Sequence, residues 1–284
     1  EWFASGPLIC YIIPTNLLGY DRSRLRSARS DMNRSSLPLL GLVIPAALLA
    51  AWWLAPRLGG VAPVLLPVPE AVWEAFVRMA ADGSLAAHIG MSAMRTMTGF
   101  VLAAAFGIGC GVWFTVRPAA AAASHFVIEF LRLTPPLALI PVLILWLGID
   151  EAPKIAIVFL SSFFPIYLSA LTAVKGIDPK LAEVAELLRF TSAERFRMLT
   201  LPAAMPGILA GLRMGFGYSW RALVGAELIA ASSGLGFLIT ESSEFGKTDV
   251  VFVGIFTIVG LGIAADAVIS RLVSALSRRI SEAA

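Results

Sequence analysis

Residues that bind metals or form disulfides are scarce in this sequence. The 284 residues include two cysteines, Cys10 and Cys110, and two histidines, His88 and His125. None of the four lies at the short spacing typical of a zinc site, and the cysteines are far apart along the chain. We therefore expect neither a bound metal nor a disulfide framework, and we interpret the isolated histidines as packed or interfacial side chains.

Charged residues are also scarce. They make up 14% of the chain, whereas soluble domains contain about 25%. Hydrophobic residues make up 58%, and the mean hydropathy is +0.83. This composition excludes an ordinary soluble domain and predicts an integral membrane protein with the lipid bilayer around it. We expect no nucleic acid among its partners.

Six apolar stretches are long enough to cross a bilayer at about 1.5 Å per residue. They are residues 37–56, 93–116, 124–147, 154–174, 204–231 and 250–270. Prolines between 135 and 141 must interrupt the helical hydrogen bonds of the third stretch. Glu129 and Arg132 precede these prolines and favour an interfacial helix over 119–132, with the crossing after it. Such a broken helix is tolerated only inside a bundle or beside a polar cavity. The predicted fold is all-α, a polytopic membrane protein of about six transmembrane helices.

Residues 1–36 differ from the rest of the chain. The apolar stretch Pro7–Leu18 is too short to span a bilayer, and a basic run follows it, which is the reverse of a signal peptide. We interpret 1–36 as an N-terminal cytoplasmic extension in preference to a surface anchor attracted to anionic lipid. The membrane domain is then 37–284.

Basic residues are distributed unevenly between the two sides of the predicted membrane domain. With the N-terminus inside, the opposite side holds only four of them, Arg57, Arg78, Lys154 and Lys247. The cytoplasmic segments hold Arg22, Arg24, Arg26, Arg29, Arg34, Arg117, Lys175, Lys180, Arg189, Arg195, Arg197, Arg271, Arg278 and Arg279. This asymmetry predicts a multi-pass protein with both termini, and the segment 178–202, in the cytoplasm.

The segment 178–202, called the charged loop below, is predicted to form two short helices. Asp178 before Pro179 is typical of a helix start, because the carboxylate accepts from free N–H groups of the first turn. Thr191 and Glu194 form a capping box that begins a second helix. Apolar residues on one stripe of the first helix are Leu181, Val184, Ala185 and Leu188. The result is a helix–turn–helix with an exposed elbow at 188–192, and Pro202 marks where the second helix ends or continues into the next.

This loop carries a resemblance. Glu183-Val184-Ala185, with Leu201-Pro202 at the end of the segment, resembles the EAA loop in permease subunits of bacterial ATP-binding-cassette importers. Residues 131–149 and 202–239 are similar to the branch that imports sulfonates, taurine, nitrate and related small ions. The resemblance covers roughly residues 37–280. The usual loop glycine of the family falls at Arg189, and a left-handed backbone there would cost about 1 kcal/mol relative to glycine.

The resemblance implies a type I importer permease in the bacterial inner membrane. Two copies would surround a shared path and join a dimer of cytoplasmic ATPase subunits, which bind ATP and Mg²⁺, and an extracytoplasmic substrate-binding protein would deliver the substrate. The chain itself would be no enzyme, with no catalytic residue and no cofactor. Loop residues expected to contact the ATPase are Glu183, Ala185, Leu188, Arg189, Phe190, Thr191 and Arg195.

The sequence itself offers no nucleotide site. Residues 241–248 read ESSEFGKT, which ends like a phosphate-binding loop. The first glycine of that motif is replaced by Glu241, and no predicted strand precedes the segment. On the predicted topology it also lies outside the cytoplasm.

Charges within the predicted spans are costly and normally face partners or water. Arg213, Arg221 and Glu227 share a broad face of the fifth span, and small polar residues, Ser232 and Ser233, follow that span. One interpretation is that these five residues line the translocation path of an anionic substrate. The alternative is that Arg213 or Arg221 pairs with Glu227 or Asp266 and holds the bundle together. Arg95, near the start of the second span, has no assigned partner.

Glycines within two spans indicate close helix packing. Gly207, Gly211 and Gly215 recur every four residues on the fifth span, and the second span contains Gly107, Gly109 and Gly111. Residues 67–82 predict an amphipathic interfacial helix with Val68, Val72, Trp73, Phe76 and Met79 on or near one face.

Two other functions remain open at this point. A secondary transporter or channel would work without ATP, and a non-transporting scaffold would only recruit a partner through the loop. An internal repeat or an intramembrane acid pair would favour the transporter, and neither is visible in the sequence. The identity of the substrate is also left open, because in this family specificity resides chiefly in the binding protein.

Overall fold

The computed structural model describes residues 37–62 and 64–283, so the predicted extension 1–36 lies outside the described part. The chain divides into two compact units, residues 1–61 and 62–284. The described part of the first unit contains the apolar helix α2 (Leu37–Arg57). In this helix the Arg57 guanidinium lies 3.8 Å from the centre of the Trp53 ring.

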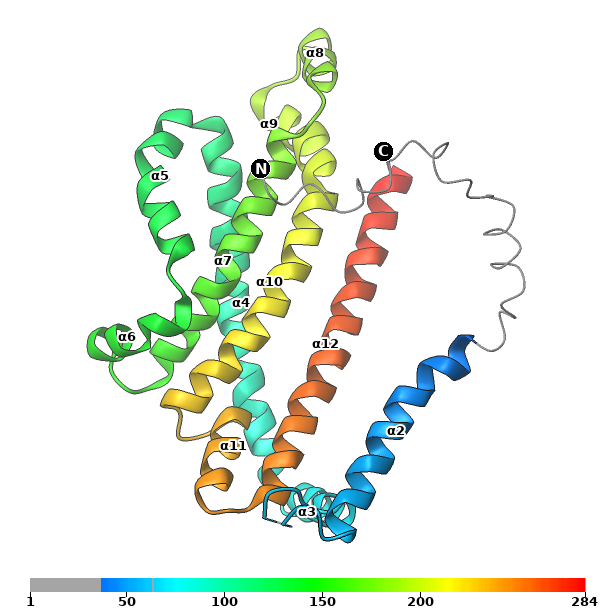
Figure 1. Cartoon of the computed structure of the whole chain (residues 1–284). Coiled ribbons are helices and arrows are strands. Elements are labelled where there is room, and N and C mark those ends of the chain that lie inside the picture. Colours follow the sequence, from blue (N-terminus) through cyan, green and yellow to red (C-terminus); the bar gives the residue numbers. More distant parts are fainter. Residues whose placement is uncertain (1–36, 63, 284) are drawn as a thin grey trace, which may run out of the picture. The chain divides into compact units, whose positions relative to one another are not determined.

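The second unit is helical throughout its described residues (Figure 1). The helices are α3 (Pro69–Ala81), α4 (Ser84–Val116), α5 (Pro118–Leu133), the 3₁₀ turn η2 (Pro136–Leu139), α6 (Ile140–Leu147), α7 (Glu151–Lys175), α8 (Pro179–Leu187), α9 (Ser192–Arg195), the π-helical turn η3 (Phe196–Thr200), α10 (Leu201–Ala230), α11 (Leu235–Glu244) and α12 (Thr248–Ala283). The predicted all-α fold is confirmed for the described residues.

Four helices in the described part, α4, α7, α10 and α12, lie in segments long and apolar enough to cross a membrane. They match the second, fourth, fifth and sixth predicted spans. The third predicted span is broken: α5 and the segment Pro136–Leu147, which comprises η2 and α6, meet at an angle of 94°. The prolines at 135–136 explain this break, because they cannot donate backbone hydrogen bonds. The crossing expected after residue 132 is not one helix, since α6 has 8 residues and extends only about 12 Å.

Helix α7 packs against a row of glycines on each of two neighbours. A methyl group placed on Gly211 of α10 would lie 2.4 Å from Ser169 Cβ, and one on Gly207 would lie 2.5 Å from Ala173 Cβ. On the α4 side, a methyl group on Gly111 would lie 2.8 Å from Ala170 Cβ. The packing predicted for Gly207, Gly211, Gly215, Gly107 and Gly111 is therefore confirmed, whereas Gly109 faces open space. Helices α4, α7 and α10 thus form one close-packed core.

The two ends of the second unit differ in what they carry (Figure 1). The charged loop, with α8 and α9, lies at one end, which we call the loop end. Helices α3 and α11 lie at the other, which we call the turn end because residues 231–234 connect α10 to α11 there. Together with the first two residues of α11, they form what we call the 231–236 turn. Helix α3 buries Val72, Ala75 and Met79, while Trp73 and Phe76 stack with ring centres 5.5 Å apart and remain exposed. Those two aromatic residues therefore face away from the packed side of the predicted amphipathic helix.

Candidate functional site

The charged loop folds as its caps predict. Asp178 Oδ1 accepts a hydrogen bond from the Lys180 N–H at 2.9 Å, which begins α8. Thr191 and Glu194 form the reciprocal capping box: the Thr191 N–H donates to Glu194 Oε2 at 2.8 Å, and the Glu194 N–H donates to Thr191 Oγ1 at 3.3 Å. These local bonds hold the two predicted helices and leave the elbow between them.

The elbow places an arginine where the backbone favours glycine. Arg189 has φ 53°, and among the described residues it alone combines a side chain with a positive φ. The Phe190 N–H donates to the Ala185 carbonyl at 3.0 Å, and the Arg189 N–H donates to the Glu186 carbonyl at 3.0 Å. This pair of bonds is a Schellman motif, whose left-handed position normally carries glycine. The arginine therefore costs about 1 kcal/mol relative to glycine.

The outer face of the loop is left uncovered by the rest of the unit. Ala185 is buried at 1% exposure, but Leu187 is 83% exposed and Leu188 is 60% exposed. The polar residues predicted to contact a partner, Glu183, Arg189, Thr191 and Arg195, are exposed as well. A cavity of about 470 Å³ lies where the loop meets the ends of α4 and α7. The loop therefore exposes apolar and charged side chains on its outer face and has a cavity on its inner side.

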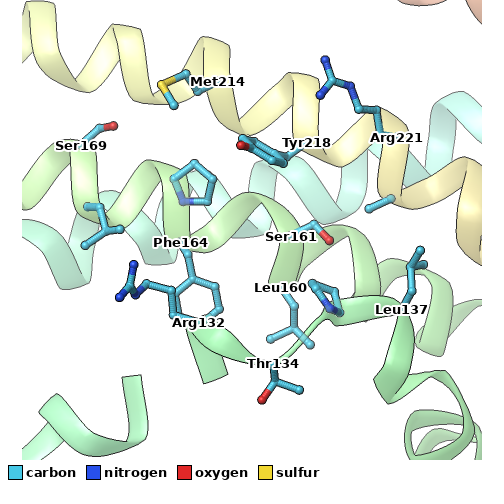
Figure 2. Close-up of a pocket in the computed structure, with 14 residues that line it drawn as sticks. Arg132, Thr134, Leu137, Leu160, Ser161, Phe164, Ser169, Met214, Tyr218 and Arg221 are labelled. Carbon is cyan, nitrogen blue, oxygen red and sulfur yellow. The ribbon is translucent and has the colours of Figure 1, made fainter. Parts of the chain in front are cut away.

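A cavity of about 570 Å³ lies between the α5–η2 segment, α7 and α10 (Figure 2). Polar side chains in its wall are Arg132, Thr134, Ser161, Ser169, Tyr218 and Arg221. No carboxylate from the described part of the chain lines it. Arg132 pairs with Glu129 at 2.5 Å. Arg221 is exposed and forms no ion pair with the described residues, so it leaves an uncompensated positive charge at this cavity.

The other predicted path residues lie elsewhere. Arg213 Nη2 lies 3.0 Å from Asp266 Oδ2, and both side chains are about half exposed on α10 and α12. Glu227 is 1% exposed and lies with Ser233 in a separate cluster, while Ser232 is exposed. The structure therefore brings Glu227 and Ser233 together and separates them from Arg221 and Arg213.

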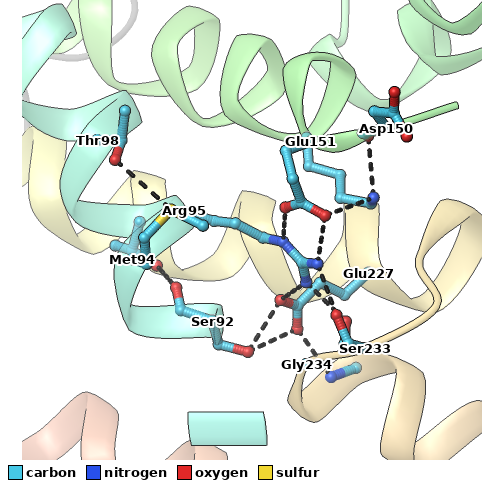
Figure 3. A network of polar contacts seen from close by, with 12 residues as sticks. Ser92, Met94, Arg95, Thr98, Asp150, Glu151, Glu227, Ser233 and Gly234 are labelled. Atoms are coloured by element: carbon cyan, nitrogen blue, oxygen red, sulfur yellow. Dashed lines mark hydrogen bonds and ion pairs between the residues drawn. The ribbon is translucent and has the colours of Figure 1, made fainter. Parts of the chain in front are cut away.

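This separate cluster is centred on Arg95 of α4 (Figure 3). Arg95 is fully buried, and its Nη1 lies 2.7 Å from Glu227 Oε1. Arg95 Nη2 donates to Glu151 Oε1 of α7 at 2.8 Å and to Ser233 Oγ at 2.9 Å. Ser92 Oγ lies 2.9 Å from Glu227 Oε2. We call Ser92, Arg95, Glu151, Glu227 and Ser233 the Arg95 cluster.

The sequence predicts that Arg95 and Glu227 lie within spans, but it does not predict that they pair with each other. Arg95 and Glu227 were recognised as charges within spans, but they lie 132 residues apart and on different helices. The signal that points to the pairing is Gly234 and Gly236 after the fifth span. A methyl group on Gly234 would lie 2.3 Å from Glu227 Oε1, and one on Gly236 would lie 2.6 Å from Glu227 Cβ.

Comparisons with known proteins give a consistent result. The family described as "Binding-protein-dependent transport system inner membrane component" matches residues 103–282. The taurine transport system permease protein TauC of Escherichia coli (strain K12) is 38% identical over 218 residues, which cover 75% of this chain and 79% of that protein. A Bacillus subtilis (strain 168) permease assigned to aliphatic sulfonate transport is 37% identical over 222 residues, or 78% of this chain and 80% of its own length.

Solved structures of transporters are similar in fold, and one of them serves as an example. A chain of the inward-facing MetNI methionine ABC transporter aligns with a TM-score of 0.59 and 16% sequence identity, covering 69% of this chain and 95% of that chain. The fold predicted from the resemblance, that of an importer permease, is confirmed.

Proposed function

Because this chain belongs to the family of binding-protein-dependent transport system inner membrane components and is a permease subunit of an ATP-driven importer, we propose that its substrate is a small anion. Sulfonates, nitrate and taurine are the candidates; taurine is a zwitterion whose sulfonate group supplies the anionic end. The observation that carries this proposal is the cavity beside α7 and α10, whose wall contains arginine and serine but no carboxylate.

The chemistry of this cavity suits an anionic group. Arg221 offers planar N–H donors without a carboxylate to neutralise them, and guanidinium forms strong paired hydrogen bonds with oxyanions. Ser161 and Tyr218 add hydroxyl groups, and Leu137 and Phe164 supply apolar wall. A substrate with an oxyanion head and a short carbon chain would find partners for both parts. Arg213, Glu227, Ser232 and Ser233 do not line this cavity. Arg213 and Glu227 instead hold neighbouring helices together through their ion pairs with Asp266 and Arg95.

We propose that the charged loop transmits the energy of ATP to this path. Support comes from the exposed Leu187 and Leu188 and from the strained Arg189 at the elbow. Partner contact with a cytoplasmic ATPase dimer would bury these apolar side chains. Glu183, Arg189 and Phe190 are the residues we assign to this mechanical contact, with the exposed Leu188, Thr191 and Arg195 beside them. Ala185, predicted to belong to the contact, is buried and supports the loop from its inner side. ATP and Mg²⁺ would bind to the ATPase and not to this chain.

The complete importer would contain two copies of this chain in the bacterial inner membrane. A substrate-binding protein would deliver the anion at the turn end, and both termini would lie in the cytoplasm with the loop end. The distribution of basic residues supports this orientation. The relatives that are permeases of transport systems support the assembly in general terms.

The proposal is tested by reconstituting the permease with its ATPase and binding protein in proteoliposomes. We expect ATP-dependent uptake of taurine, an alkanesulfonate or nitrate, and no uptake of an uncharged solute. Arg221→Gln should lower uptake about tenfold or more, since a charge-assisted hydrogen bond contributes about 1.5–3 kcal/mol. Arg221→Lys keeps the charge and should retain more activity.

Two outcomes would count against the proposal. Normal uptake by a properly inserted Arg221→Gln variant would remove Arg221 from the path. Uptake that continues without ATP would favour a secondary transporter or channel over the coupling assigned to the charged loop. The Arg78→Gln variant, in which an exposed arginine at the turn end is replaced, serves as the charge-matched control and should behave as the wild type.

A further inference from the structure

Three backbone N–H groups at the start of α11 donate to side chains from elsewhere in the fold. Its first N–H groups have no partners within the helix, as at any helix start. The Gly234 N–H donates to His88 Nδ1 at 3.1 Å, the Leu235 N–H to Ser92 Oγ at 2.9 Å, and the Gly236 N–H to Glu227 Oε2 at 2.9 Å. Two of these acceptors belong to α4 and one to α10. The 231–236 turn is therefore fixed by tertiary contacts and not by its own sequence.

Two of these acceptors, Ser92 and Glu227, belong to the Arg95 cluster, which holds them in place. The Arg95 side chain is fully enclosed and donates to the Ser233 carbonyl at 2.6 Å as well as to Glu227. Glu227 in turn accepts from Ser92 on its other side. Because a buried carboxylate is stable only when it is paired and hydrogen-bonded, each member of the cluster depends on the others. The two glycines of the turn make the approach possible, since a side chain on either would collide with Glu227.

Glu151 differs from the rest of the cluster. It belongs to α7, pairs with Arg95, and its carboxylate also lies 3.3 Å from Lys154 Nζ. Its side chain is 39% exposed, whereas the side chains of Arg95 and Glu227 are fully buried. The cluster thus has a buried core, formed by Arg95 and Glu227, and one exposed member, Glu151. Removal of a partner from a buried ion pair is far more costly than removal from an exposed one.

We propose that Arg95 and Glu227 are positioning residues for transport. They fasten the 231–236 turn to the ends of α4, α7 and α10, so that these parts stay together as one rigid body in every nucleotide state of the importer. Opening and closing of the path then occurs between this body and other parts of the assembly, and not by release of the turn. The inference about the nucleotide states depends on the proposed coupling to an ATPase, whereas the fastening of the turn does not.

Hydrogen exchange measured by mass spectrometry tests this directly, because three consecutive N–H groups in one short peptide bond only to the side chains described above. In the assembled importer, peptides covering 231–240 should exchange slowly and equally with and without trapped ATP. Glu227→Gln should accelerate their exchange about tenfold or more, as expected from losing a charge-assisted hydrogen bond. It should also lower the amount of solute imported per ATP hydrolysed.

Controls and milder variants keep the test decisive. Arg78→Gln removes an exposed ion pair with Asp249 at the same end and should leave exchange of 231–240 unchanged. Should Glu227→Gln fail to insert, Ser92→Ala removes one acceptor and should accelerate exchange at Leu235 without abolishing folding. The permease without its ATPase gives the same exchange measurement, so fastening of the turn is tested even if the proposed function is wrong.

The proposal is overturned by either of two results. Exchange of 231–240 that rises in one nucleotide state of the wild-type importer would show that the turn is released during the cycle. Unchanged exchange and unchanged coupling in inserted Glu227→Gln and Ser92→Ala variants would show that the cluster does not position the turn.

Discussion

The turn end and the loop end of the helical unit differ in how far their side chains are buried and paired within the chain. Each contains a short segment between long helices, rich in polar groups that need partners. At the turn end, Arg95, Glu227 and Ser92 are buried and fully hydrogen-bonded within the chain. At the loop end, Leu187 and Leu188 remain exposed and Arg189 holds a strained backbone. The buried polar groups of the first segment are paired within the chain, whereas the second leaves apolar side chains uncovered, as the proposed contact with an ATPase requires.

We interpret the turn end as a part that keeps its structure during transport, and the loop end as a part that a partner protein contacts. A buried ion pair with all its partners present makes local unfolding costly. An exposed loop with few buried contacts has a low free energy of local unfolding. We expect force applied at the loop end to pass along α7 and α10, because their glycine contacts allow little relative movement. Substitutions that remove these features should affect the two ends to very different degrees.

The largest expected effect is at the centre of the turn end. Arg95→Ala leaves the Glu227 carboxylate buried without a counter-charge, which should lower the free energy of unfolding by about 3–5 kcal/mol. Thermal unfolding of the purified permease in detergent measures this. The double variant with Glu227→Ala should lose less than the sum of the two single losses, because neither charge is then left alone. Strict additivity would show that the pair is not coupled.

The next effect lies in the helix contacts that connect the two ends. Gly211→Ala should lower the free energy of unfolding by about 1–3 kcal/mol, because the new methyl group meets Ser169 on α7. Gly217→Ala is the matched control on the same helix: nothing lies within 4 Å of its added methyl group. This control should be neutral or slightly stabilising, since alanine favours helix more than glycine by about 1 kcal/mol. Equal effects at both positions would contradict the packing.

A smaller effect, of opposite sign, is expected at the elbow of the loop end. Arg189→Gly should stabilise α8 locally by about 1 kcal/mol, because glycine adopts the left-handed conformation without strain. Hydrogen exchange of peptides covering α8 measures the change. Arg189→Ala removes the same side chain but keeps the strain, so it should give no such gain. A gain with alanine would assign the effect to lost charge and not to the backbone.

The smallest effect on stability is expected at Arg195. Its Nη1 lies 3.9 Å from Glu186 Oε1 and both side chains are exposed, so Arg195→Glu should change the free energy of unfolding by less than about 1 kcal/mol. Its effect on function should be larger, because charge reversal on the loop surface should uncouple ATP hydrolysis from uptake. Unchanged uptake by the inserted variant would remove Arg195 from the contact with the ATPase.

The contrast also explains what could be predicted from the sequence. The charged loop was predicted in detail because its caps at Asp178 and Thr191 act within a few residues, and the glycine rows were visible as a period along one helix. The bend at residues 135–136 was expected from proline, but its angle of 94° depends on neighbouring helices.

The turn end was not predictable in the same way. The pairing of Arg95 with Glu227 joins distant parts of the chain, and helical periodicity on α10 suggested only that Glu227 shared a face with Arg213 and Arg221. In the structure Glu227 pairs with Arg95 and Arg213 with Asp266, while Arg221 forms no ion pair with the described residues. Gly234 and Gly236 carry the only local trace of this arrangement, as positions where a side chain would collide with Glu227.

One measurement tests the contrast between the two ends most directly: hydrogen exchange of the whole permease with and without its ATPase. We predict that the ATPase protects peptides covering 178–199 at the loop end and leaves peptides covering 231–240 at the turn end unchanged. Protection that appears at the turn end, or no protection at the loop end in a complex that hydrolyses ATP, would contradict the account.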